Sequence, residues 1–106
     1  MDSKEYKVEL SQRAANDIYY YIVFKLRNPS AAEKLSSHIF DEVEKLTFSP
    51  KRYKVIDIPG LKTDHRRLPI KNYFAYFLVD DDKDEVTITT IQHNKRNVLF
   101  LGIGKN

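Results

Sequence analysis

The sequence contains no cysteine, so disulfide frameworks and thiol chemistry are excluded, and this composition is typical of a cytosolic protein. It also lacks a long uncharged apolar run that could span a membrane. The first residues, MDSKEYKVEL, do not resemble a signal peptide. We therefore expect a protein that resides in the cytoplasm and has no membrane partner.

The length of 106 residues is enough for one domain with a single hydrophobic core. The net charge is +3, but it is unevenly distributed, because residues 1–50 carry 7 Lys and Arg against 8 Asp and Glu, whereas residues 51–106 carry 11 against 7. The basic second half suggests an anionic partner, either nucleic acid or an acidic protein segment. The alternative interpretation is a solvated surface with a slight basic excess.

The first half of the chain predicts a strand followed by two helices. Polar and apolar residues alternate over Tyr6–Leu10, as in a strand. Ser11 then provides a helix N-cap, and apolar residues at helical spacing predict a helix that ends near Asn28-Pro29. The apolar stripe of this helix consists of Ala15, Ile18, Ile22 and Leu26.

The second helix is expected to begin at Ser30, which has capping-box spacing to Glu33. It is expected to end at Ser49-Pro50. The short connection between the two helices predicts an antiparallel helical hairpin, and neither helix can bury its apolar face without a sheet. The apolar face of the second helix consists of Ala32, Leu35, Ile39, Val43 and Leu46.

The second half of the chain supplies that sheet. HRRLPI, NYFAYFLV and EVTITTIQH are predicted strands, and Arg52–Ile58 is a possible further strand. NYFAYFLV is apolar on both faces, which indicates a strand in the middle of the sheet, and the short connections favour antiparallel pairing. We predict a single α+β domain of order β-α-α-β-β-β, with the helical hairpin across one face of a small, mainly antiparallel sheet.

Three blocks of sequence together resemble the RelE/ParE superfamily of type II toxin–antitoxin toxins. They are YKVELSQRAANDIYYYI, NPSAAEKL with IFDEVEKLTFSPKRY, and HRRLPIKNYFAYFLVDDD with VTITTIQHNKRN. The resemblance covers roughly residues 5–100 and rests on the order and spacing of the blocks, since no single motif is specific. It implies a growth-inhibiting toxin that forms a hetero-oligomer with a cognate antitoxin. We expect an acidic segment of that antitoxin to cover part of the region of Arg66, His93 and Arg96, or the helical hairpin.

The resemblance leaves the target of the toxin open. In the RelE-like branch the toxin enters the ribosome and cuts mRNA without a metal, through attack of the ribose 2′-hydroxyl. In the ParE-like branch the toxin inhibits DNA gyrase and carries no comparable nuclease site. A third possibility is a relative that has lost toxicity and only binds its antitoxin. None of the three requires a cofactor.

The nuclease interpretation requires an acid or base and cations that stabilise the charged phosphorane. His93 is the candidate acid or base, because the ordinary pKa of histidine lies near neutrality. Arg66 and Arg67 are the candidate catalytic cations, since a guanidinium can hold two phosphate oxygens. They are adjacent in a predicted strand, so their side chains should point to opposite faces. The three histidines lack zinc-type spacing, and we expect no metal site.

Two departures from the RelE-like pattern favour the ParE-like branch. An arginine commonly follows the central-strand tyrosine in RelE-like nucleases, whereas Phe74 follows it here, and Phe100 stands where a C-terminal tyrosine is frequent. Phenylalanine can neither donate a proton nor bind phosphate. We therefore interpret the segment IQHNKRN as a docking surface, and the expected partner-binding residues are Arg66, His93, Lys95, Arg96 and Tyr20.

Overall fold

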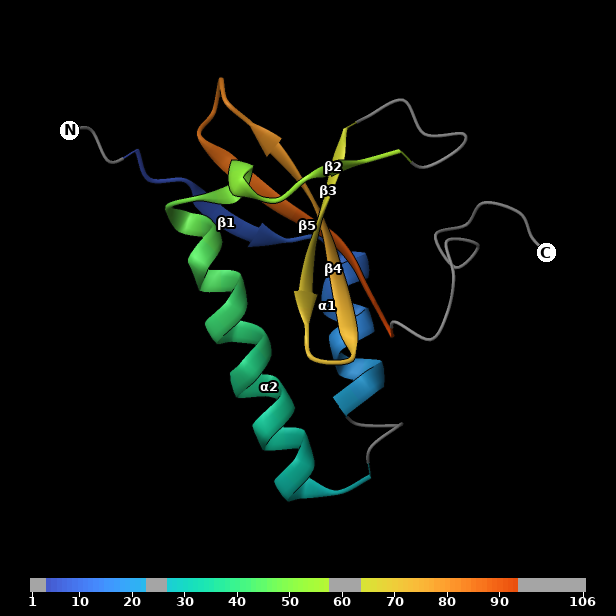
Figure 1. Cartoon of the computed structure of the whole chain (residues 1–106). Coiled ribbons are helices and arrows are strands. Elements are labelled where there is room, and N and C mark those ends of the chain that lie inside the picture. The colour runs from blue at the N-terminus through green and yellow to red at the C-terminus, as the bar shows by residue number, and fades with distance from the viewer. Residues whose placement is uncertain (1–3, 23–26, 58–63, 94–106) are drawn as a thin grey trace.

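The computed structural model describes residues 4–22, 27–57 and 64–93. They form one five-stranded mixed sheet of order β1-β5-β4-β3-β2 and two α-helices (Figure 1). The elements are β1 (Lys7–Leu10), α1 (Gln12–Tyr19), α2 (Pro29–Glu44), η2 (Lys45–Thr47), η3 (Pro50–Arg52), β2 (Val55–Ile56), β3 (His65–Ile70), β4 (Tyr73–Asp80) and β5 (Glu85–His93). The predicted α+β class is confirmed.

Side-chain caps define where both helices begin. The Ser11 hydroxyl accepts a hydrogen bond from the Ala14 backbone N–H at 3.0 Å, as the sequence predicts. The predicted capping box at Ser30 is wrong, because the Asn28 side chain caps α2 by accepting from the Ala31 N–H at 3.1 Å. Pro29 is therefore the first helical residue, a position where its fixed φ is favourable and its missing N–H has no cost.

Helix α1 leaves α-helical geometry earlier than the apolar stripe predicts. Residues 20–22 continue in the wider π-helical geometry, and Arg27 adopts a left-handed conformation with φ of 51°. The helical path is thus broken before Asn28, while the predicted stripe residue Leu26 lies outside the described residues. Helix α2 follows in the opposite direction (Figure 1).

Four consecutive strands, β2 to β5, form the antiparallel part of the sheet. Lys71 and Asn72 connect β3 to β4, and residues 81–84 connect β4 to β5. The first strand, β1, pairs with β5 in parallel, with Lys7 opposite Glu85 and Leu10 opposite Ile88. Among the described residues of the possible strand at Arg52–Ile58, Val55 and Ile56 form β2, which pairs with β3 and adds one strand to the predicted order. Ile58 lies outside the described residues.

Strand alternation separates two faces of the sheet. Tyr73, Ala75 and Phe77 of β4 point into the hydrophobic core, together with buried residues of both helices. The predicted face of the second helix is largely confirmed, since Leu35, Ile39, Val43 and Leu46 are all buried. The opposite side of β4 carries Phe74 and Tyr76. We call it the helix-free face, because neither described helix packs on it.

None of the helices in the described ranges is long and apolar enough to cross a membrane.

Candidate functional site

His93, the candidate acid or base, lies at the last position of β5 opposite Tyr73. Its ring meets the Tyr73 ring edge-on at a centroid distance of 5.1 Å. The row continues to Tyr21 at 4.9 Å from Tyr73, and then to Tyr20 at 5.4 Å from Tyr21. Burial, and then the nearby Tyr21, raise the pKa of Tyr73. This aromatic row connects the strand end to the exposed Tyr20.

The backbone edge of β5 that leads to His93 is held by helix α1. Pairing with β1 ends at Ile88, so the following residues have no strand on that side. The Asp17 carboxylate accepts from the Ile91 N–H at 2.9 Å and from the Thr90 hydroxyl at 2.7 Å. One turn later, the Tyr21 hydroxyl accepts from the His93 N–H at 3.3 Å. Asp17 of α1 and Tyr21 of the π-helical turn that follows it thus replace the missing strand.

A buried polar chain connects these two anchors. The Tyr21 hydroxyl donates to Oε1 of Gln92 at 3.4 Å, and Nε2 of Gln92 donates to the Thr90 hydroxyl at 2.9 Å. Gln92 and Thr90 are each only 5% exposed. Every member has a partner, which is the condition under which a buried polar network supports a unique structure. These hydrogen-bonded side chains hold the end of β5 and thereby the position of His93.

Arg66, the first candidate arginine, binds backbone carbonyls. Its guanidinium donates to the Tyr53 carbonyl at 2.7 Å and to the Lys51 carbonyl at 3.4 Å. Lys51 belongs to η3, and Tyr53 is the residue that follows η3. Arg66 therefore connects residues 51–53 to β3, next to the pairing of the short strand β2 with β3.

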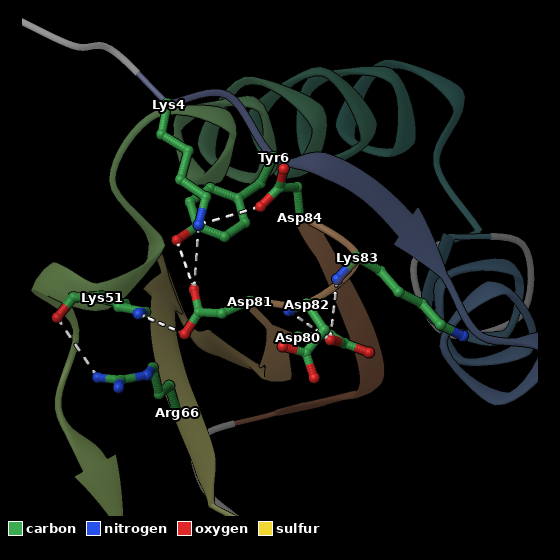
Figure 2. Close-up of polar contacts among 9 residues, drawn as sticks. All are labelled: Lys4, Tyr6, Lys51, Arg66, Asp80, Asp81, Asp82, Lys83 and Asp84. Carbon is green, nitrogen blue, oxygen red and sulfur yellow. Dashed lines mark hydrogen bonds and ion pairs between the residues drawn. The ribbon is translucent and has the colours of Figure 1, made fainter.

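The segment is held again through Asp81 in the β4–β5 loop (Figure 2). The Asp81 carboxylate forms an ion pair with Lys51 and accepts from the Tyr6 hydroxyl at 2.8 Å. These two contacts hold the pKa of Asp81 at about 2, below its usual 3.8. Lys4 lies 3.0 Å from Asp84 and 3.6 Å from Asp81, and the hydrogen bond to Asp84 raises the pKa of Lys4 to about 12. The acidic loop thus anchors the start of the chain.

The rest of the aspartate run forms a hairpin turn. Oδ1 of Asp80 accepts from the N–H groups of Asp82 and Lys83 at 3.0 and 3.1 Å, a local side-chain bond that favours a turn. Within residues 4–22, 27–57 and 64–93 no group of three metal-ligating side chains comes together.

Arg67, the second candidate arginine, is exposed on the helix-free face. Its guanidinium lies over the Phe74 ring at 4.2 Å from the ring centroid. Tyr76 is opposite Arg67 in the register and only 2% exposed. Burial raises the pKa of Tyr76, and a hydrogen bond with Arg67 opposes that shift. Phe74 therefore supports a neighbouring cation on the same face.

The structure does not bring the candidate catalytic residues together. Arg66 is opposite Phe77 and His93 is opposite Tyr73, so four residues of β4 and two strand spacings separate them, roughly 15 Å. The Arg67 side chain lies on the face of the sheet opposite to that of Arg66. The expected docking residues Lys95 and Arg96, and also Phe100, lie outside the described residues.

Several residues of this arrangement were not identified from the sequence as site residues. Asp17 and Tyr21 have the i, i+4 spacing that places two side chains on one helix face, which is the only local signal for them. Gln92 and Thr90 lie within the alternating pattern of a predicted strand, and Asp81 lies within a run of aspartates. Neither pattern indicates a site residue. The partners Asp17, Tyr21 and Tyr6 lie more than 70 residues away from them in sequence.

The chain was compared with known protein families and with curated proteins. The sequence model of the family described as the ParE toxin of the type II toxin–antitoxin system parDE matches residues 8–98. A comparison with curated proteins returned no match.

The solved structures with the same fold include the following three chains. A chain of a chromosomal ParDE TA system from P. aeruginosa superposes with a TM-score of 0.64 at 23% identity, over 86% of this chain and 98% of that one. A chain of the RelBE2 toxin–antitoxin complex from Mycobacterium tuberculosis gives 0.62 at 20% identity, over 87% and 97%. A chain of the archaeal RelE-RelB complex from Pyrococcus horikoshii OT3 gives 0.61 at 14% identity, over 88% and 99%.

Proposed function

Because the chain belongs to the ParE toxin family of type II toxin–antitoxin systems, we propose that it inhibits growth in the cytoplasm by binding DNA gyrase. The observation that carries this proposal is the match of the ParE toxin model to residues 8–98, most of the chain. The superposed structures do not separate the two targets, since ParDE and RelBE systems match with similar TM-scores. The proposal therefore also depends on the chemistry of the sheet.

That chemistry favours contact over catalysis. His93 is part of an aromatic row, Arg66 binds backbone carbonyls, and the two lie at different ends of the β4 pairing. Metal-free RNA cleavage needs an acid or base and a cation at the same phosphate. Phe74 adds an apolar ring where the RelE-like pattern has a cation. A protein that acts by binding needs none of these groups to converge.

The cognate antitoxin is the second partner in this proposal. An apolar groove lies between β1 and α2, and we call it the β1–α2 groove; it is lined by Val8, Glu9, Leu10, Phe40, Val43, Glu44 and Thr47. Leu10 and Phe40 are 36% and 50% exposed. Strand β1 is an edge strand of the sheet, so its outer edge can pair with an added strand.

The side chains that line this groove indicate what kind of antitoxin segment would bind there. Apolar side chains would fill the space above Leu10 and Phe40, while the carboxylate of Glu44 would pair with a cation. The sequence predicted an acidic antitoxin segment on the basic residues Arg66, His93 and Arg96, or binding at the helical hairpin. The groove belongs to the second of these alternatives.

The alternative function is ribosome-dependent mRNA cleavage, and one observation favours it. The Arg67 guanidinium lies over the Phe74 ring, so a cation is present near the position that the RelE-like pattern fills with arginine. A single experiment in cells separates the two functions. The chain is induced without its antitoxin, and new RNA 5′ ends and the topology of a reporter plasmid are measured in the same culture.

We expect growth arrest with a loss of negative supercoiling and no new 5′ ends. New 5′ ends inside translated codons, in phase with the reading frame, would instead establish the nuclease. Growth without either change, with the protein confirmed folded, would leave a relative that only binds its antitoxin.

A further inference from the structure

The Arg67 side chain is held in a defined orientation on the helix-free face. Its guanidinium lies 4.2 Å from the centroid of the Phe74 ring, and it shares a hydrogen bond with the buried Tyr76. The Phe74 and Tyr76 rings are themselves 6.4 Å apart. Stacking on an aromatic face restricts a guanidinium while leaving its N–H edge able to donate. Arg67 is exposed despite these contacts.

The charge of Arg67 is not neutralised by a carboxylate of the described chain. The ion pairs among the described residues involve Lys4, Lys7, Lys45 and Lys51, and none involves Arg67. An exposed arginine that is fixed on aromatic rings has the composition of a binding hot spot. Its planar fork matches a carboxylate through two parallel hydrogen bonds.

The remaining charges on this face distinguish between kinds of partner. Asp80 and Glu85 are opposite each other at one end of the face, and Lys7 forms an ion pair with Glu9 at 3.2 Å beside them. Three carboxylates therefore share the face with Arg67 and Lys7. Single-stranded nucleic acid needs a positively charged groove along its backbone. A face that carries both charges and one fixed arginine is therefore better suited to binding a protein segment than to binding nucleic acid.

We propose that the helix-free face is the gyrase-binding surface, and that Arg67, held on Phe74, binds a carboxylate of a mixed-charge gyrase segment. This inference rests on the proposed function and assigns its contact. Phe74 acts as a positioning residue, because it orients the guanidinium.

The test measures binding of the purified chain to immobilised gyrase holoenzyme. The variants are Arg67→Glu, Arg67→Lys and Phe74→Ala, and the matched control is Lys34→Glu, which makes the same change of charge at an exposed position of α2. Loss of a buried charge contact predicts at least about thirty-fold weaker binding for Arg67→Glu. Arg67→Lys keeps the charge but lacks the fork, so we expect about five- to ten-fold weaker binding. Lys34→Glu should stay within about two-fold, as expected for a charge outside the interface.

Each variant is also tested for antitoxin binding, which reports whether it is folded; if Arg67→Glu does not fold, Arg67→Lys and Phe74→Ala decide the result. Unchanged gyrase affinity in folded Arg67 and Phe74 variants would overturn the assignment while leaving gyrase as the target. Absence of binding by the unmodified chain would refute the proposed function itself. If Arg67→Glu instead abolished codon-phased mRNA cleavage in cells, the partner of this face would be RNA.

Discussion

The carboxylate of Asp17 on helix α1 accepts a hydrogen bond from the backbone N–H of Ile91 on β5, at 2.9 Å. The contact lies where β5 extends beyond its pairing with β1. An unpaired backbone donor at a sheet edge is costly when buried and promotes association when exposed. By covering this donor, Asp17 allows β5 to continue to His93 without a partner strand on the side of β1.

Replacing Asp17 by alanine should therefore destabilise the fold. The change leaves the Ile91 N–H and the Thr90 hydroxyl without their acceptor, which we expect to cost about 2–3 kcal/mol of unfolding free energy. Urea denaturation measures this loss. Asn16→Ala is the control, because the Asn16 side chain accepts an exposed hydrogen bond from Gln12, and its loss should change stability by less than about 0.5 kcal/mol. A loss for Asp17→Ala no larger than that of the control would contradict the role of the carboxylate.

Acid should weaken the anchor formed by Asp81. Hydrogen bonds from Lys51 and Tyr6 hold its pKa at about 2 in the folded protein, against the usual 3.8. A carboxyl with a lowered folded-state pKa stabilises the fold above its unfolded value, and this stabilisation is lost as the pH falls from 3.8 through 2. Unfolding free energy measured against pH should therefore fall more steeply in this window for the unmodified chain than for Asp81→Asn.

Asp82→Asn, in the same loop, is the control and should retain the steep fall. Because Asp81 is exposed to solvent, the effect should also shrink in high salt. Parallel curves for the unmodified chain and Asp81→Asn would show that the contact does not form in solution.

The β3–β4 turn offers a stabilising substitution. Lys71 has a positive φ of 52°, a conformation that strains residues with a Cβ atom and suits glycine. We expect Lys71→Gly to raise the unfolding free energy by about 0.5–1 kcal/mol, after the entropy cost of glycine. Chemical denaturation measures the change. Lys83→Gly is the matched control, since Lys83 is a turn residue without a positive φ, and it should be neutral or destabilising; equal effects of the two would argue against strain at Lys71.

The β1–α2 groove predicts where the antitoxin is anchored. Phe40→Asp places a charge among Val8, Leu10 and Val43 and should weaken antitoxin binding at least about thirty-fold, as for a hot-spot residue. Phe48→Asp is the matched control, because Phe48 is 59% exposed and does not line the groove. Isothermal titration with the purified antitoxin measures both. Equal affinity for the two variants would exclude the groove as the anchor.

Local patterns predicted most of the elements but not how they meet. Helical spacing identified the buried residues Leu35, Ile39 and Val43 of α2, and strand alternation placed Arg66 and Arg67 on opposite faces, as the register confirms. The cap of α2 was misassigned because Asn28 and Ser30 both suit an N-cap, and the choice between them depends on Pro29.

The site depends on contacts that no local pattern contains. The parallel pairing of β1 with β5 joins residues 78 positions apart. Because this pairing ends at Ile88, the Ile91 N–H needs another acceptor, which Asp17 supplies. The extra residue of β5 between Ile88 and Thr90 shifts the register against β4 and interrupts simple alternation. The partners of Arg66 and Arg67, two carbonyl groups and one ring, follow from these tertiary arrangements.

The most direct test of the central claim is gyrase-catalysed supercoiling of relaxed plasmid DNA in the presence of increasing amounts of the purified chain. We expect inhibition that depends on the concentration of the chain and is reversed when the cognate antitoxin is added in equimolar amount. Full supercoiling activity at a large molar excess of folded, antitoxin-binding chain would contradict the proposal that gyrase is the target.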